Sequence, residues 1–241
     1  MGEPMIRAEM VREYKRLGHE EKVLLSKNGK KKPSIVRKKL EDKIPDKLAG
    51  TLNAAFAKAF ELVFNYGTAA ISKTVSEDKG KYADTTETAA TFMEGTVLGI
   101  MGVGVPDIPV YTAVVLRSIY QIAEDCGFDY ENKAEKAYIL MLIECSLSKG
   151  EYALKVNEEL DRLASEIDDH DKPYYGLLTE YMNRAAKALS DDMLYMKFIQ
   201  SVPVVGAAGG VSNAVTLKKI RRFAEVKYKR RQFGNMLKQH P

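Results

Sequence analysis

The residues of this chain that could do chemistry are few and scattered. Acidic side chains and a histidine lie together only at Asp168, Asp169, His170 and Asp171. Carboxylate and imidazole groups are metal ligands, but a metal site needs ligands that converge in space, and this run has the composition of a turn. We therefore interpret it as a solvated acidic loop, and we predict no metal site and no cofactor.

No catalytic or nucleotide-binding motif stands in the sequence. G-x-x-x-x-G-K-[ST] is absent, and GVGVPD at 102–107 lacks the rest of a dinucleotide-binding fingerprint. Neither a serine nor a cysteine occupies the sharp turn of a nucleophile elbow. We therefore predict that the protein is not an enzyme, and we rank an enzyme with a cryptic site last of three hypotheses.

Three polar residues stand in otherwise apolar surroundings. Asp107 follows a proline and suits a helix cap, whereas Arg117 is expected to be buried against a carboxylate of another helix. A polar site that these two residues share with Asn213 is the alternative. Prolines that break helices and a glycine that permits close helix approach complete the predicted structural or polar core: Pro106, Pro109, Pro203 and Gly206.

Charge is distributed unevenly along the chain. Residues 1–50 carry 14 basic and 8 acidic side chains, residues 51–212 carry 14 and 24, and residues 213–241 carry 9 and 1. Basic ends can hold anionic lipid, nucleic acid or an acidic partner, or they can be solvated faces without a partner.

The segment 218–232 reads as a basic amphipathic helix, which suits an anionic membrane surface. Nucleic acid is the competing partner, but no nucleic-acid-binding module is recognisable and the middle of the chain is acidic, so we predict none. The residues predicted to contact an anionic surface are Lys30, Lys31, Lys32, Lys218, Lys219, Arg221, Arg222, Arg230 and Arg231.

The elements that must position these residues are all predicted to be helices, because no run alternates in the manner of a strand. We expect an all-α protein, a single multi-helix bundle. Expected helices cover residues 5–27, 34–43, 46–75, a segment from 85, 108–126, 133–148, 151–167, 173–189, 191–196 and 218–232.

Two apolar stretches, residues 95–129 and 198–217, organise this bundle, and both are broken by proline and glycine. Each approaches the ~20 residues of a membrane span. Either they insert as shallow hairpins, or they form the buried core of a soluble bundle. The segment LRSIYQIAE at 116–124 resembles LKKIRRFAE at 217–225, which indicates a weak internal repeat or helical convergence.

At these residues the sequence resembles the EcsC family. VPDIP at 105–109 is similar to the family's L-P-D-x-P-like motif, Arg117 falls where the family has an arginine, and Gly127 with Asp129 resembles its Y-G-x-D ending, with Cys126 in place of the usual tyrosine. VPVVG at 202–206, followed by Asn213, resembles the second family motif. The chain end from Ala224 through Tyr228 to Arg231 fits too, and the resemblance covers roughly residues 40–232.

The resemblance implies a helical bacterial protein associated with membranes or transport operons, and it carries no settled activity. We expect a basic helix and turn at 1–34, the EcsC-like domain at 35–232 and a tail at 233–241. The leading hypothesis is a non-enzymatic protein, peripheral at the inner, cytoplasmic face of the membrane and accessory to a transport or envelope system, with anionic lipid and a transport protein as partners. The alternative is a soluble bundle that binds a lipid or small apolar ligand in its core.

Overall fold

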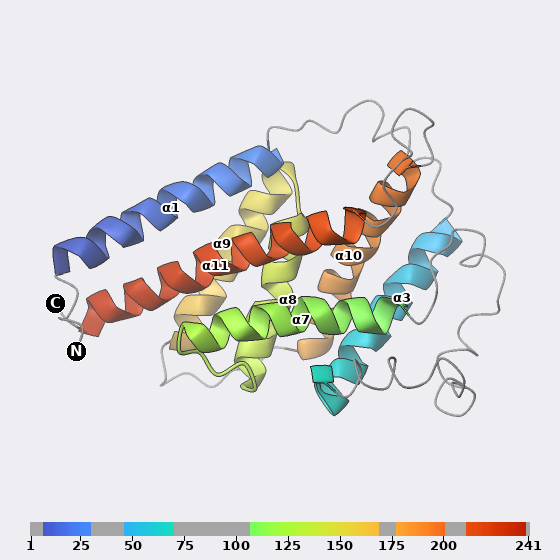
Figure 1. Ribbon diagram of the computed structural model, residues 1–241, viewed down its shortest axis with the longest axis horizontal. Helices are drawn as coiled ribbons and strands as arrows, with labels where there is room; N and C mark the ends of the chain where they lie inside the picture. Colours follow the sequence, from blue (N-terminus) through green and yellow to red (C-terminus); the bar gives the residue numbers. More distant parts are fainter. Residues whose placement is uncertain (1–6, 30–45, 70–106, 169–176, 201–210, 240–241) are drawn as a thin grey trace. The chain divides into compact units, whose positions relative to one another are not determined.

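The computed structural model describes residues 7–29, 46–69, 107–168, 177–200 and 211–239, and all regular structure in these ranges is α-helical (Figure 1). The expected all-α class is therefore confirmed. The helices are α1 (Arg7–Gly29), α3 (Asp46–Tyr66), α7 (Asp107–Asp125), α8 (Lys133–Leu147), α9 (Gly150–Asp168), α10 (Leu178–Gln200) and α11 (Val211–Gln239).

The chain forms two compact units that interleave along the sequence. Unit 1 comprises Met1–Lys32, Ser118–Leu178 and Thr216–Pro241, and unit 2 comprises Pro33–Arg117 and Thr179–Val215. The predicted boundary at residue 34 lies outside the described residues and stays a prediction. Helix α1, however, belongs to unit 1 and packs against α9.

Unit 2 is built around α3, whose buried side chains recur every three to four residues: Leu48, Leu52, Phe56, Ala59, Phe60 and Val63. The ring of Phe56 meets the ring of Tyr111 in α7 edge-on at 6.5 Å, and the Ser190 hydroxyl in α10 donates to the Ala49 carbonyl. The helix expected to reach residue 75 ends at Tyr66, because Gly67 adopts φ 82°, a left-handed conformation that stops helices.

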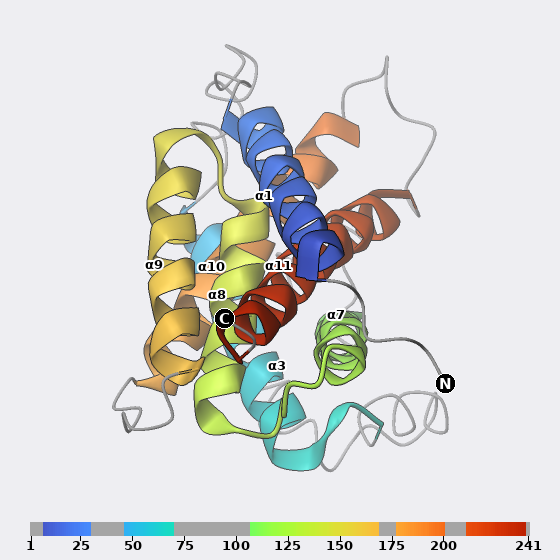
Figure 2. The ribbon, with the colours of Figure 1, turned by 90° about the vertical axis from the view of Figure 1, so that its left-hand side faces the viewer.

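The centre of unit 1 is α8, in which every residue except Lys133 and Lys136 is buried. Asn132 caps its first turn, since the Asn132 side chain accepts a hydrogen bond from the Ala134 N–H at 2.8 Å. Gly150 takes φ 63° and lets the chain reverse, so that α9 lies beside α8 (Figure 2).

Helix α11 covers this pair with Ile220, Phe223, Ala224, Val226 and Tyr228, all of which are buried. It is longer than the predicted helix 218–232 at both ends, because its first turns take up the end of the second apolar stretch and residues 233–239 of the expected tail continue it. Helix α10 is likewise continuous where two helices were expected, since nothing at Asp191 interrupts the backbone hydrogen bonds.

Helix α1 is held by much less apolar surface than α3. Its buried hydrophobic side chains are Met10, Leu17 and Leu25, and one acidic residue, Glu21, is also buried. Val11, Val23 and Leu24 are half-buried, and most of the other residues of α1 are charged or polar. Electrostatic contacts therefore contribute to placing this helix beside a small apolar stripe.

None of the helices within the described residues is long and apolar enough to cross a bilayer. Residues 95–106 and 201–210, which carry much of the two apolar stretches, lie outside the described ranges.

Candidate functional site

The polar site of unit 1 lies on α11, where two basic side chains are buried. Lys227 is only 3% exposed and Arg231 8% exposed. A buried cation must be paired and hydrogen-bonded, because leaving water costs it several kcal/mol. The structure provides those partners from three other helices.

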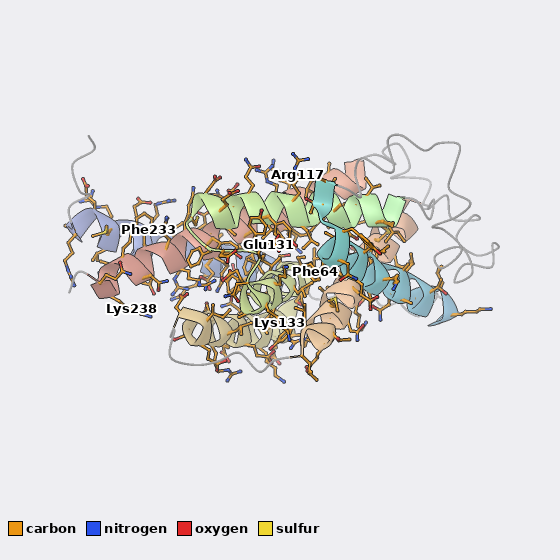
Figure 3. All side chains as sticks on the ribbon, turned by 90° about the horizontal axis from the view of Figure 1, so that it is seen from below. Phe64, Arg117, Glu131, Lys133, Phe233 and Lys238 are labelled. Atoms are coloured by element: carbon orange, nitrogen blue, oxygen red, sulfur yellow. The ribbon has the colours of Figure 1, made fainter. Side chains whose placement is uncertain are left out.

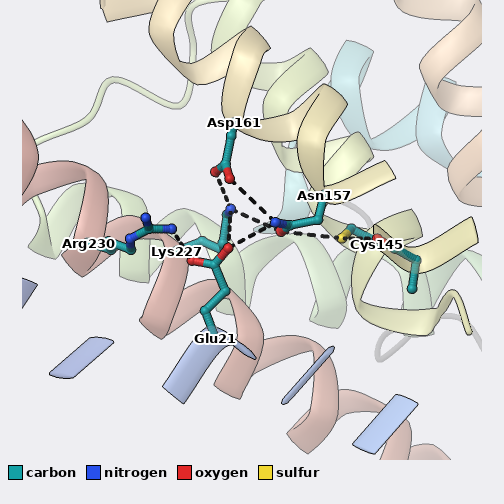
Figure 4. Close-up of polar contacts among 7 residues, drawn as sticks. Glu21, Cys145, Asn157, Asp161, Lys227 and Arg230 are labelled. Carbon is teal, nitrogen blue, oxygen red and sulfur yellow. Dashed lines mark hydrogen bonds and ion pairs between the residues drawn. The ribbon is translucent and has the colours of Figure 1, made fainter. Parts of the chain in front are cut away.

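Lys227 lies in a cluster of polar groups from α1, α9 and α11 (Figure 4). Its ammonium donates to Glu21 at 3.2 Å and to the side-chain oxygen Oδ1 of Asn157 at 3.1 Å, and it also pairs with Asp161. The Asn157 amide in turn donates to Glu21 at 3.0 Å. Each of these polar groups thus has a hydrogen-bond or ion-pair partner within the cluster.

Glu21 accepts from a second cation, since Arg230 Nη1 donates to Glu21 Oε2 at 2.5 Å. Burial alone would raise the pKa of Glu21, but Lys227, Arg230 and the Asn157 amide together hold this pKa below its ordinary value. Glu21 is therefore an ionised carboxylate in the interior of unit 1.

Arg231 joins α8 and α9 to α11. Its Nη1 donates to both oxygens of Glu135, at 2.8 and 2.9 Å, while Nε and Nη2 bind Asp168 at 2.7 to 3.1 Å. The guanidinium carbon lies 4.2 Å from the centroid of the Phe128 ring and 4.7 Å from that of Tyr138. All three nitrogens of the planar guanidinium thus donate to carboxylates of two helices, which the single ammonium of a lysine could not do.

These contacts correct the predicted surface. Arg231 was expected to face an anionic membrane, but its charge is neutralised inside unit 1. Arg230 is part-buried against Glu21, and Arg222 pairs with Glu20 and Glu225. Lys227 and Arg231 continue the spacing of Ile220, Phe223 and Ala224, and this periodicity is the sequence signal that could have assigned them to the interior.

The remaining predicted residues are dispersed. Lys218 and Arg221 are exposed on α11, Lys219 is half-buried, and Pro109 lies in the first turn of α7, where proline is tolerated. The expected burial of Arg117 is wrong, because this side chain is exposed on α7 (Figure 3).

Several predicted residues cannot be placed in a polar core. Asp107 and Asn213 belong to the first turns of α7 and α11, but their side chains lie outside the description. The shared site of Asp107, Arg117 and Asn213 thus stays a prediction that an exposed Arg117 does not favour. Residues wholly outside the described ranges are Lys30, Lys31, Lys32, Pro106, Pro203 and Gly206.

A cleft of about 250 Å³ opens above the paired charges, and all its lining residues belong to unit 1. Asp161, Ser165 and Asp168 of α9 form one wall. Lys227, Arg231 and Asn235 of α11 form the other, with Lys238 near the end of this helix (Figure 3). Arg230 also lines the cleft, so four cations face it with two carboxylates, Asp161 and Asp168. Lys227, Arg230 and Arg231 are paired with carboxylates, which leaves Lys238 as the lining cation without an ion pair to a described residue.

The groups of this site are not arranged for nucleophilic or metal chemistry. Burial raises the pKa of the Cys145 thiol to about 12, and burial also raises the pKa of Cys126, so neither is a ready thiolate at neutral pH. Within the ranges that the structure describes, His, Cys, Asp and Glu nowhere gather in a group that could hold a metal ion.

The chain is thus an all-α protein in which a buried ionic network holds the C-terminal helix α11 against the other helices of unit 1. The chain belongs to the EcsC protein family, whose model matches residues 9–233. The match begins in α1, well before residue 40, so it includes the helix that supplies Glu21.

A relative with a known sequence is the uncharacterized protein YdbA of Bacillus subtilis (strain 168). It is 25% identical to this chain over 170 residues, which are 68% of this chain and 59% of the relative. The chain thus spans less than two thirds of that relative's length. No solved structure matches the chain.

Proposed function

We propose that this protein is a non-enzymatic peripheral membrane protein that binds anionic lipid at the cytoplasmic face of the membrane through α11. The observation that carries the proposal is a pair of exposed cations, Lys218 and Arg221, which form no ion pair with any residue in the described ranges. Lys229 is also exposed, about three turns beyond Lys218 on the same face of the helix.

Electrostatic attraction to anionic lipid is the physical basis of this proposal. A basic residue close to an anionic leaflet contributes roughly 1 kcal/mol to binding. Two such residues correspond to a factor of about thirty in the partition coefficient, since about 1.4 kcal/mol is tenfold. The family supplies a further part of the proposal, an accessory role beside a membrane transport protein or in an envelope system.

Co-sedimentation with vesicles tests the proposal. The full chain is mixed with phosphatidylcholine vesicles with and without phosphatidylglycerol, at low and at high salt. We expect binding to the anionic vesicles alone and loss of this binding at high salt, because salt screens exposed charges. The double variant Lys218→Glu/Arg221→Glu is expected to bind at least about thirtyfold more weakly.

The matched control is Lys155→Glu/Arg162→Glu, which reverses two exposed charges on α9, in the same unit. If both double variants lose binding equally, net charge and not the α11 surface is responsible. Binding that survives high salt would favour insertion of the apolar stretches, and the absence of any binding would contradict the proposal.

A further inference from the structure

Helix α1 places carboxylates on the cations of α11. Glu20 pairs with Arg222, and Glu21 pairs with both Lys227 and Arg230. Glu13 lies close enough to Lys229 for their charges to interact. An acidic side of α1 thus neutralises much of the basic helix that the sequence presents as a membrane-binding element.

The contact between α1 and α11 relies on long polar side chains. The guanidinium of Arg230 lies 5.2 Å from the centroid of the Tyr14 ring, and Gly234 of α11 lies next to that ring, since a Cβ there would stand 3.4 Å from Tyr14 Cε2. Because α1 buries few hydrophobic side chains, anions that replace its carboxylates can compete with this contact.

One donor under α1 has no acceptor. Arg230 Nε is buried and makes no hydrogen bond within the described residues. Gly18 lies over this side of the guanidinium, because a Cβ at residue 18 would stand 3.5 Å from Nε and 4.0 Å from Nη2. The Nε–Nη2 edge of arginine is suited to bidentate binding of a phosphate, so α1 covers a ready phosphate-binding edge without satisfying it.

We propose that α1 is a displaceable acidic cover, and that phosphate groups of anionic phospholipids take the places of Glu20 and Glu21 on Arg222 and Arg230. The inference rests on the proposed membrane function and deepens it, since it names the device that regulates exposure of the basic surface. Displacement of α1 would free these cations on α11 and would expose the buried Met10, Leu17 and Leu25 on α1 itself, so that both basic and apolar groups become available to the membrane.

Hydrogen exchange of the full chain, read by mass spectrometry with and without vesicles, measures displacement directly. In the presence of phosphatidylglycerol-containing vesicles we expect amides of residues 10–26 to exchange at least about tenfold faster, because local opening removes their protection. Amides of the buried helix α8 should be unchanged. Phosphatidylcholine vesicles alone should leave both helices as in the free protein.

The variant Glu20→Gln tests the same cover by weakening it. Loss of the partly exposed pair with Arg222 should make vesicle binding about two- to fivefold tighter. The matched control is Glu9→Gln, which removes one negative charge from an exposed position of α1 that forms no ion pair with any described residue. A general charge effect would act equally in both variants.

The outcomes separate the two proposals. If the chain binds anionic vesicles while α1 stays as protected as in the free protein, the cover is refuted and the membrane function stands. If neither the wild-type chain nor Glu20→Gln binds, both proposals fail. Equal tightening by Glu20→Gln and Glu9→Gln also counts against the cover.

Discussion

Arg231 shows how one side chain can connect three helices. It meets carboxylates of α8 and α9, and Tyr228, one turn earlier, donates to the same Glu135 at 2.8 Å. A buried ion pair contributes little more to stability than apolar residues of similar volume would. Removing one partner, however, leaves the other charge buried without a counter-charge. The network is therefore expected to matter most when it is broken on one side.

Arg231→Ala should lower the free energy of unfolding by about 3–5 kcal/mol, because it leaves the buried Glu135 and the part-buried Asp168 without a cation. Urea unfolding at neutral pH measures the change. Lys229→Ala, an exposed substitution two residues away, should stay within about 0.5 kcal/mol of the wild type. Equal effects of the two substitutions would show that the buried pairs contribute little.

The lowered pKa of Glu21 predicts a pH dependence of stability. Because the pKa is lower in the folded chain than in the unfolded one, the stability that ionised Glu21 contributes is complete above the unfolded value of about 4.3. It is lost as the pH falls through the folded value. Glu21→Gln should therefore destabilise by about 3 kcal/mol at pH 7 and by clearly less at pH 3.

Urea unfolding of both chains from pH 3 to pH 7 measures this difference. Glu9→Gln serves as the control, since Glu9 is exposed on the same helix and contributes no buried pair. A destabilisation by Glu21→Gln that is the same at every pH would contradict the assignment of an ionised Glu21.

At the scale of the elements, the helix ends follow from local signals. Gly127 ends α7 with φ 82°, and its N–H donates to the Glu124 carbonyl while the Phe128 N–H reaches the Ala123 carbonyl, both at 2.9 Å. This double hydrogen bond is the Schellman motif, which favours glycine. Asn132 caps the next helix, α8, seven residues after α7 ends at Asp125.

Asn132→Ala should cost about 1 kcal/mol, because it leaves the Ala134 N–H at the start of α8 without its acceptor. Thermal unfolding measures the loss as a lower Tm. Asn132→Asp keeps a side-chain oxygen at the same position and should remain close to the wild type. If aspartate and alanine destabilise alike, the cap hydrogen bond is not what positions this helix end.

The sequence predicts such ends because the information is local, and it fails where partners are distant. Asn132, Gly127 and Pro109 act within one turn of their own helix. Arg231, in contrast, meets Glu135 and Asp168, which lie 96 and 63 residues away along the chain. A basic position on an amphipathic helix is compatible with water or with a buried carboxylate, and only tertiary packing decides between them.

The resemblance between residues 116–124 and 217–225 also follows from how helices pack. Ile119 and Ala123 in α7 are buried, as are their counterparts Ile220 and Ala224 in α11. Arg117 and its counterpart Lys218 are both exposed. Similar amphipathic helices explain the matching positions without duplication, and the internal repeat stays a prediction.

At the scale of the whole molecule, unit 1 brings together segments of opposite charge. The basic C-terminal segment and the N-terminal helix join residues 118–178. Glu135, Asp161 and Asp168 of that acidic middle then neutralise cations of α11. The charge separation that is visible along the sequence is therefore much smaller on the folded unit, which limits the number of phosphate contacts it can make with a nucleic acid.

This compensation separates a lipid surface from nucleic acid as a partner. Nonspecific DNA binding depends on several simultaneous phosphate contacts and gives Kd values of about 10⁻⁴ to 10⁻⁶ M at physiological salt. With Arg222, Lys227, Arg230 and Arg231 paired internally, we expect the chain to bind duplex DNA no more tightly than the weak end of this range.

Fluorescence anisotropy of a labelled duplex, titrated with the full chain at physiological salt, measures this affinity. The same preparation must bind anionic vesicles, which shows that it is competent. Lys218→Glu/Arg221→Glu should weaken vesicle binding and leave the DNA signal at its low wild-type level. A duplex that binds in the micromolar range and releases the chain from vesicles would instead make nucleic acid the partner of the exposed α11 cations.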